Sequence, residues 1–239
     1  MSKIRVTYSG LISFATNLVT VVTGLIFVII VTRTLTIEEF GTWGLISGLF
    51  AYAVIISPVV CYWSTRETAR GEKSGKTAVT TNSLLSFLGV TIYVIIAYFV
   101  AKQSNLDESV ILFAAILLPV IFLNDILVSI IRGWKTHSLN YGKLAFEISK
   151  ILFVVIFVYF WNLGVWGAIV ALFIAYLPSI AILLIYNIPK IKDEFNFEYV
   201  KKWLKLFWVP TYRQLPGTLV LTDVVIFSVI TGSVVGVAY

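Results

Sequence analysis

The stretch VTRTLTIEEFGTWGL, residues 31–45, separates two long apolar runs. No residue is charged between Arg5 and Arg33, and none is charged from Phe40 to Thr65. Each run exceeds the roughly 20 residues that a helix needs to cross the hydrocarbon of a bilayer. The stretch therefore predicts a short loop between two membrane spans.

The composition extends this interpretation to the whole chain. Of the 239 residues, 59% are hydrophobic and 13% are charged, whereas soluble domains carry about 25% charged residues. The run from 151 to 189 is uncharged and too long for one crossing, so it predicts a helical hairpin that turns near Trp161. The sequence predicts an all-α integral membrane protein with about seven transmembrane helices. These cover residues 6–32, 40–65, 77–101, 109–131, 142–161, 165–187 and 209–239.

The basic residues predict the orientation of the chain. With the amino terminus inside, only Arg33 and Lys102 of the 18 Lys and Arg residues lie outside. Because cytoplasmic loops concentrate Lys and Arg, we expect a multi-pass protein of the cell membrane with a cytoplasmic amino terminus. The net charge of +6 then faces anionic membrane lipids, and no nucleic-acid partner is expected.

Residues 189–208 are expected to form an amphipathic linker that does not cross. At helical spacing Phe195, Tyr199, Trp203 and Phe207 make an apolar stripe opposite a lysine-rich face. Such a helix lies flat at the membrane interface. The sequence thus predicts three parts: a six-helix lobe at 1–188, a cytoplasmic interfacial helix at 189–208, and a further helix at 209–239.

Ionisable residues inside spans are candidate sites, because each costs about 2.5 to 3.5 kcal/mol at the bilayer centre. Asp125, Ser129 and Arg132 share one face of the fourth span, at spacings of four and three. One face of the fifth span carries Lys143, Glu147 and Lys150.

Two interpretations of these faces stay open. If they meet, they form a mixed-charge cluster with net positive charge, suited to a phosphate or pyrophosphate headgroup that enters from the cytoplasm. Alternatively, an Asp125–Lys150 or Arg132–Glu147 pair only joins two helices.

Weaker candidates lie on the first and seventh spans. Asn17, beside a stripe of threonines, lines a hydrated sugar path or serves ordinary helix packing. Arg213 stands between two prolines that break the start of its helix, and it either binds substrate or snorkels to the headgroups. Asp223 lies about 15 Å further along.

Enzymatic chemistry has no support in the sequence. His137 is the only histidine and has no neighbours with metal-ligand spacing, and no phosphate-binding loop or nucleophile elbow is present. Cys61 is the only cysteine. We expect neither an enzyme nor a cofactor or metal.

Four segments together resemble the Wzx-type polysaccharide-biosynthesis flippases of the MATE/MOP superfamily. They are TRTLTIEEFGTWGL, STRETARGEKSGK, IIRGWKTHSLNYGK and LPGTLVLTDVVIFSVITGSVVGVAY. The resemblance implies two helical lobes around a central cavity, of which this chain supplies the amino-terminal lobe of six spans and the first helix of the second. The remaining carboxy-terminal lobe, or a second chain, is then a partner.

The resemblance also implies roles for individual residues. Related lipid flippases hold the pyrophosphate of their substrate with cavity arginines, which favours Arg213. Asp223 matches a recurring acidic position that either binds a coupling ion or pairs structurally.

Three functions follow as hypotheses. The first is a flippase that moves a polyprenyl-linked oligosaccharide, or a related anionic glycolipid precursor, to the outer leaflet by alternating access. The second is a MATE-like cation-coupled multidrug exporter, for which acids deep in the first two spans are expected and absent. The third is a membrane scaffold that transports nothing, in which the buried charges only pair helices.

Overall fold

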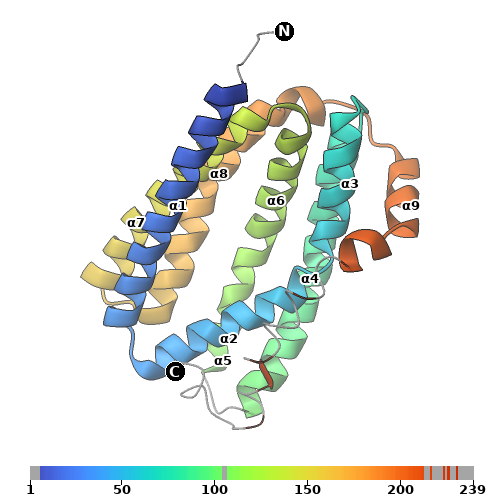
Figure 1. Ribbon diagram of the computed structural model, residues 1–239. Coiled ribbons are helices and arrows are strands. Elements are labelled where there is room, and N and C mark those ends of the chain that lie inside the picture. Colours follow the sequence, from blue (N-terminus) through green and yellow to red (C-terminus); the bar gives the residue numbers. More distant parts are fainter. Residues whose placement is uncertain are drawn as a thin grey trace.

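The computed structural model describes residues 6–103 and 107–212 and the single residues 216, 223, 225, 226 and 230, with side chains from Gly10 onward. This part of the chain is helical and contains no strand (Figure 1). The elements are α1 (Val6–Thr34), α2 (Ile37–Ala53), α3 (Ser57–Ala69), α4 (Gly75–Gln103), α5 (Glu108–Phe113), the 3-10 turn η1 (Ala114–Ile116), α6 (Leu117–Trp134), the 3-10 turn η2 (Thr136–Ser138), α7 (Leu139–Val154), the π-helix η3 (Val155–Phe160), α8 (Gly164–Ile191) and α9 (Phe197–Lys205).

The predicted fold class is confirmed. Among the described residues four helical segments are long and apolar enough to cross a membrane, namely α1, α4, the run from α5 to α6, and α8. The bent pair of α2 and α3 passes the same test as one broken span. The fifth predicted span corresponds to α7 and η3, which continue from Leu139 to Phe160. Most of the seventh falls outside the described residues.

The second predicted span is broken into two helices. The axes of α2 and α3 differ by 57° across residues 54–56. Pro58 lies in the first turn of α3, where its missing N–H costs no helical hydrogen bond. As a result α2 runs obliquely across one end of the bundle, while α3 stands nearly parallel to α4 and α6 (Figure 1).

The loop predicted within residues 31–45 is a tight turn at Leu35 and Thr36, between the end of α1 and the start of α2. Thr36 caps α2 by accepting from the Glu39 amide, and the Glu39 carboxylate accepts from the Thr36 amide in return. This capping box satisfies two amide groups that the first helical turn would leave unpaired. Among the described residues no salt bridge joins Glu39 to Arg33, which is exposed.

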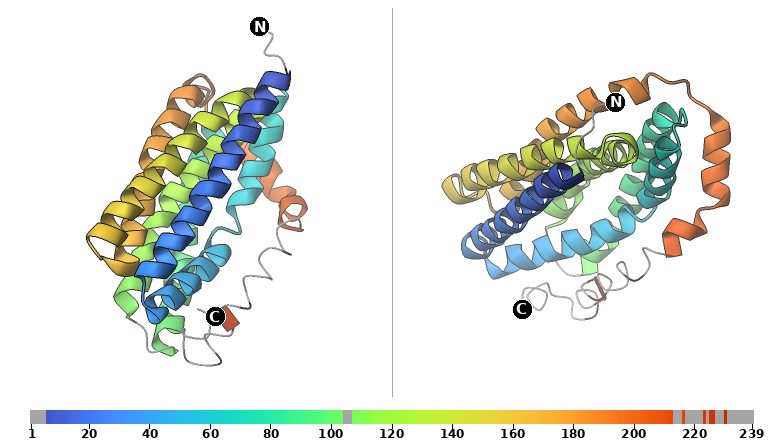
Figure 2. Two further views of the ribbon diagram at one scale, coloured as in Figure 1. Left: turned by 60° about the vertical axis from the view of Figure 1, so that its left-hand side comes forward. Right: turned by 45° about the horizontal axis from the view of Figure 1, so that its top comes forward.

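Helix α8 occupies the middle of one side of the bundle. It packs extensively against α6 and α7, which make few contacts with each other, while α1 covers α7 (Figure 2). On the other side α6 packs against α3, and Gly133 permits the close approach, because a Cβ there would lie 2.7 Å from the Thr65 carbonyl oxygen.

Helix α9 is docked on the protein by its aromatic stripe. Trp203 is 1% exposed and packs in a core cluster with Val60, while Phe207 is 54% exposed. Lys202 donates to the buried Glu67 carboxylate at 2.7 Å, and the Tyr199 hydroxyl donates to Glu72 at 2.9 Å. The stripe therefore faces α3 and α4 with part of its surface. The predicted three-part division and the cytoplasmic side of α9 stay predictions.

Candidate functional site

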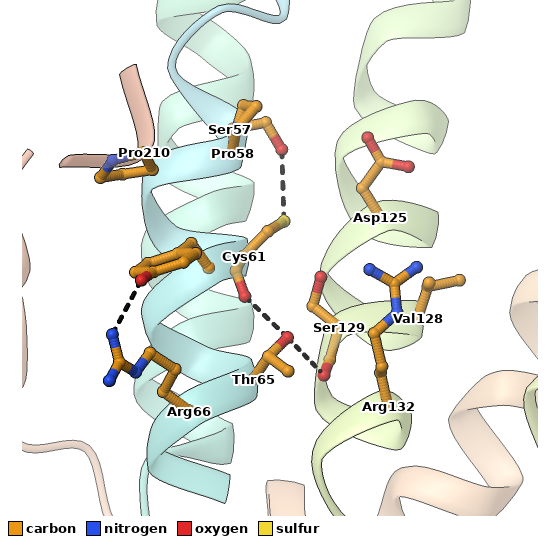
Figure 3. Close-up of a pocket in the computed structure, with 11 residues that line it drawn as sticks. Ser57, Pro58, Cys61, Thr65, Arg66, Asp125, Val128, Ser129, Arg132 and Pro210 are labelled. Atoms are coloured by element: carbon orange, nitrogen blue, oxygen red, sulfur yellow. Dashed lines mark hydrogen bonds between the residues drawn. The ribbon is translucent and has the colours of Figure 1, made fainter. Parts of the chain in front are cut away.

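A cavity of about 530 Å³ lies between α3 and α6. Figure 3 shows its two walls: Ser57, Cys61, Thr65 and Ser129 lie between the two helices, whereas Arg66 extends to the side of α3 that faces away from α6. Its lining residues are Ser57, Pro58, Cys61, Tyr62, Thr65, Arg66, Asp125, Val128, Ser129, Arg132 and Pro210.

Helical spacing places the α3 side chains in one row. Ser57, Cys61 and Thr65 follow each other at intervals of four, so they stack along one face. The Thr65 hydroxyl lies 3.0 Å from the Cys61 carbonyl oxygen and 2.9 Å from that of Ser129 on α6. This shared contact ties the two walls together.

The charges of the cavity consist of two guanidinium groups and one carboxylate. The guanidinium of Arg132 extends along α6 toward Asp125, two helical turns away (Figure 3). Arg66 on the facing helix donates to the Tyr62 hydroxyl at 2.8 Å, and its guanidinium carbon lies 5.5 Å from the centre of that ring. No salt bridge among the described residues engages these three charged groups. The guanidinium groups therefore keep donors available for an anion, which they can bind in bidentate fashion.

A second polar group lies between α1 and α7. Glu147 and Lys150 are both buried and form an ion pair, and the Thr23 hydroxyl donates to the same carboxylate. The Lys150 ammonium also lies 5.4 Å from the centre of the Phe146 ring and 5.8 Å from that of Phe27. Buried charges need such compensation, because an unpaired ion in the interior is costly.

The same interface continues toward the start of α7. Lys143 donates to the Asn17 side-chain oxygen at 2.8 Å, and Asn140 donates to the Ser13 hydroxyl at 3.2 Å. Asn17 thus lies beside the cations of α7 and outside the cavity. We call the contacts of α1 with Asn140, Lys143, Glu147 and Lys150 the α1–α7 seam.

The structure separates the two faces that the sequence left as one possible cluster. Asp125 and Arg132 line the cavity, whereas Glu147, Lys150 and Asn17 belong to the α1–α7 seam. Helix α8 packs between α6 and α7. The suggested pairs Asp125–Lys150 and Arg132–Glu147 are not formed, since Glu147 takes Lys150 of its own helix.

Of the two candidates on the seventh span, Asp223 lies among the described residues and Arg213 does not. Arg213 lies outside the described residues, and its role stays a prediction. Asp223 is a described residue and is exposed; its suggested ion-coupling role also stays a prediction.

Sequence reasoning missed the α3 wall of the cavity. The uncharged run ends at Thr65, which places Arg66 in a cytoplasmic loop, but α3 continues to Ala69. The signal that could have found this wall is the i, i+4 series of small polar residues 57, 61 and 65, followed directly by Arg66.

Comparison with known proteins identifies the fold. No protein-family profile matches the chain, and no curated protein matches it. Solved structures do match. One is a MOP superfamily transporter from Pyrococcus furiosus, described as having a binding pocket of reverse polarity that suggests a different function, with 16% identity and a TM-score of 0.65 over 84% of this chain and 50% of that one.

Two further solved structures agree with the first. A MATE protein in the straight conformation gives 18% identity and a TM-score of 0.61 over 89% of this chain and 52% of that one. An inward-facing multidrug resistance MATE transporter gives 16% identity and a TM-score of 0.61 over 87% and 56%. The chain spans about half the length of the solved structures it matches. It has the fold of one half of a MATE/MOP transporter.

Proposed function

We propose that the chain is the amino-terminal half of a MATE/MOP-type membrane transporter that moves a polyprenyl-linked oligosaccharide, or a related anionic glycolipid precursor, to the outer leaflet by alternating access. The observation that supports this proposal most is the pair Arg66 and Arg132, on facing walls of one cavity of about 530 Å³. Two arginines that line one cavity suit a phosphate or pyrophosphate.

The surroundings of the cavity support the same substrate class. Hydroxyl groups of Ser57, Thr65 and Ser129 accompany the arginines, and such groups offer hydrogen bonds to a phosphate or a sugar. Since the solved structures with this fold are about twice as long, the carboxy-terminal lobe supplies the opposite wall in the proposed transporter. Arg213 and Asp223 belong to the helix that begins that lobe, where they are the proposed further phosphate ligand and ion-coupling residue.

A MATE-like exporter of cationic compounds is the second candidate. It is supported by Asp125, a carboxylate on the wall of the same cavity, and by the likeness in fold to multidrug resistance transporters. In this alternative the carboxylate binds the cation or the coupling ion, and the arginines bind no substrate. The two candidates therefore depend on different residues of one cavity.

A transport assay on three variants of the complete gene product separates the candidates. In proteoliposomes, Arg66→Gln and Arg132→Gln should each lower the flipping rate of a fluorescent polyprenyl pyrophosphate-linked sugar roughly tenfold or more, the loss expected for a charge-assisted hydrogen bond. Asp125→Asn should abolish extrusion of a cationic dye if the second candidate holds.

Arg70→Gln provides the matched control. Arg70 is an exposed arginine of the same helix end that does not line the cavity, so its removal should leave the flipping rate unchanged. Flipping that persists in both cavity variants would refute the proposed role of the arginines. Loss of dye extrusion in Asp125→Asn alone would establish the exporter instead.

A further inference from the structure

Two aromatic side chains of α3 hold the guanidinium of Arg66 in place. Arg66 lies four residues after Tyr62 and three after Trp63, and residues at these spacings are neighbours on a helix surface. The guanidinium carbon lies 5.5 Å from the centre of the Tyr62 ring and 5.6 Å from that of Trp63. Both distances are in the range of a cation–π contact.

The aromatic pair is itself well fixed. The two rings meet edge to face with their centres 5.1 Å apart, and Trp63 is buried in a core cluster with Val59 and Val60. Arg66, in contrast, is exposed. A free arginine side chain at such a position samples many rotamers, so the contacts with the rings restrict Arg66 to one side of the cavity.

The hydrogen bond between Arg66 and Tyr62 leaves donors free on both residues. Arg66 donates through one amino group to the Tyr62 hydroxyl at 2.8 Å, so the phenol oxygen is the acceptor in this contact. A phenol also has an O–H to donate, and a guanidinium has five N–H groups. The Tyr62 hydroxyl hydrogen and most of the Arg66 hydrogens are therefore available to a third group.

This combination of donors suits an oxyanion. Because Tyr62 accepts a hydrogen bond from a cation, its own O–H is polarised and becomes a stronger donor. Phosphate oxygens carry negative charge, and hydrogen bonds to a charged acceptor are shorter and stronger than neutral ones. One phosphate group can thus accept from the Tyr62 hydroxyl through one oxygen and from the Arg66 guanidinium through another.

The charge of Arg66 is not neutralised by a described acid. Among the described residues that line the cavity, Asp125 is the only acid, and it lies on α6 with Arg132, whereas Arg66 extends to the side of α3 that faces away from α6 (Figure 3). The next residue, Glu67, is buried and accepts from Lys202 of α9. An anion at Arg66 therefore meets a positive charge with no competing carboxylate.

From these observations we propose that Tyr62 is a further substrate-binding residue, which positions the Arg66 guanidinium and donates its hydroxyl hydrogen to the same phosphate or pyrophosphate. This inference rests on the proposed function, in which the cavity receives an anionic headgroup. It assigns the charged end of the substrate to the side of the cavity at Tyr62 and Arg66.

Binding of geranyl pyrophosphate to the purified, complete gene product tests this proposal without a transport measurement. Isothermal titration calorimetry in detergent gives the dissociation constant. Tyr62→Phe keeps the ring over the guanidinium and removes only the hydroxyl, and it should raise the dissociation constant about tenfold, the loss expected for a hydrogen bond to a charged group. Tyr62→Leu also removes the ring and should raise the constant further, because Arg66 is then no longer held.

A double-mutant cycle separates the positioning role from a purely structural one. In an Arg66→Gln background, Tyr62→Leu should weaken binding clearly less than in the wild type, because the side chain that it positions is already gone. Weakening by the same factor in both backgrounds would overturn the positioning role. Tyr212→Phe is the matched control, because this tyrosine is 77% exposed and does not line the cavity, so its dissociation constant should equal that of the wild type.

The outcomes distinguish this inference from the proposed function. If Arg66→Gln weakens binding and Tyr62→Phe does not, the inference is wrong and the proposed function stands, even if Tyr62→Leu does not fold. If the wild type does not bind geranyl pyrophosphate, or if Arg66→Gln binds it equally well, both are wrong. Inorganic pyrophosphate should bind more weakly than its geranyl ester; equal affinity would keep the role of Tyr62 and remove the lipid from the proposed function.

Discussion

Lys202 on α9 donates to the Glu67 carboxylate on α3 at 2.7 Å, across 135 residues of sequence. The Glu67 side chain is 3% exposed and that of Lys202 is 46% exposed. The contact therefore joins a buried anion to a cation that still touches solvent. It fixes α9 to α3, which also lines the cavity between α3 and α6.

We expect Lys202→Met to destabilise the protein by about 1–3 kcal/mol, because it leaves the Glu67 carboxylate buried without its cation. Lys201→Met is the matched control: its partner Glu198 is exposed, and an exposed pair contributes about 0–1 kcal/mol. Unfolding free energies in detergent, measured with a denaturant, give both values. Similar losses in the two variants would show that the Glu67 contact has no special weight.

The hydrogen bond between Tyr199 and Glu72 predicts an alkaline limit to α9 docking. Partial burial, and next the bond to the Glu72 carboxylate, raise the pKa of Tyr199 to about 12. Because the folded pKa is above the ordinary value of about 10, this stabilisation is complete below pH ~10 and is lost as the pH rises toward the folded pKa.

Hydrogen exchange of residues 197–205 between pH 9 and 12 measures the docking. Tyr199→Phe should remove the part of the pH dependence that this hydroxyl causes. Tyr212→Phe, at a tyrosine that is 77% exposed, should leave the profile unchanged. A wild-type profile retained in Tyr199→Phe would assign the alkaline transition to another group.

Gly133 sets the distance between the two walls of the cavity between α3 and α6. In Gly133→Ala the new Cβ would lie 2.7 Å from the Thr65 carbonyl oxygen and 2.8 Å from the Thr68 Cβ, so the helices must separate, at about 1–3 kcal/mol. Gly24→Ala meets nothing within 4 Å and should stabilise α1 by up to about 1 kcal/mol. Thermal unfolding of the two variants should move in opposite directions, and a neutral Gly133→Ala would contradict the close packing.

Substitutions of Glu147 and Lys150 test whether this pair only joins helices or also takes part in transport. Glu147→Gln leaves the buried ammonium without its anion and should cost about 3–5 kcal/mol, whereas Glu147→Gln with Lys150→Met should cost clearly less. A double-mutant cycle on unfolding free energies checks this. Transport by a stable double variant at the wild-type rate would limit the pair to joining helices, and its loss would give the pair a part in transport.

The predicted orientation is checked by thiol labelling in intact cells. In a Cys61→Ser background, Glu38→Cys should react with a membrane-impermeant maleimide, because residue 38 is exposed at the outer turn. Residue 73 is exposed between the end of α3 and the start of α4, at the other end of α3 from the α2–α3 bend, so Lys73→Cys should be protected until the cells are opened. The reverse pattern would invert the topology.

The helical membrane fold could be predicted from the sequence because uncharged runs of sufficient length have few other solutions in a bilayer. The break before Pro58 and the turn near Trp161 also follow from local residue chemistry. The packing of one helix face against another could not be predicted. Helical periodicity shows which residues share a face, but it does not show which other helix that face contacts. Arg132 and Glu147 were plausible partners on that basis, and only the placement of α8 separates them.

The site was predictable in part for the same reason. Asp125 and Arg132 stood out as charges in an apolar run, whereas Arg66 lay at its edge, where a snorkelling or loop position is the ordinary outcome. Its place on the cavity wall depends on the continuation of α3 to Ala69 and on the short distance to α6 at Gly133. Both are tertiary effects.

Cys61, the only cysteine of the sequence, lies on the wall of the cavity between α3 and α6. The given sequence thus has a single thiol, at a position suited to site-specific labelling of this cavity. In the proposed transporter, a spin label or fluorophore attached there would report the opening and closing of this space. The labelling rate of the Cys61 thiol, measured at increasing concentrations of a phosphorylated lipid, would give a binding isotherm for that lipid.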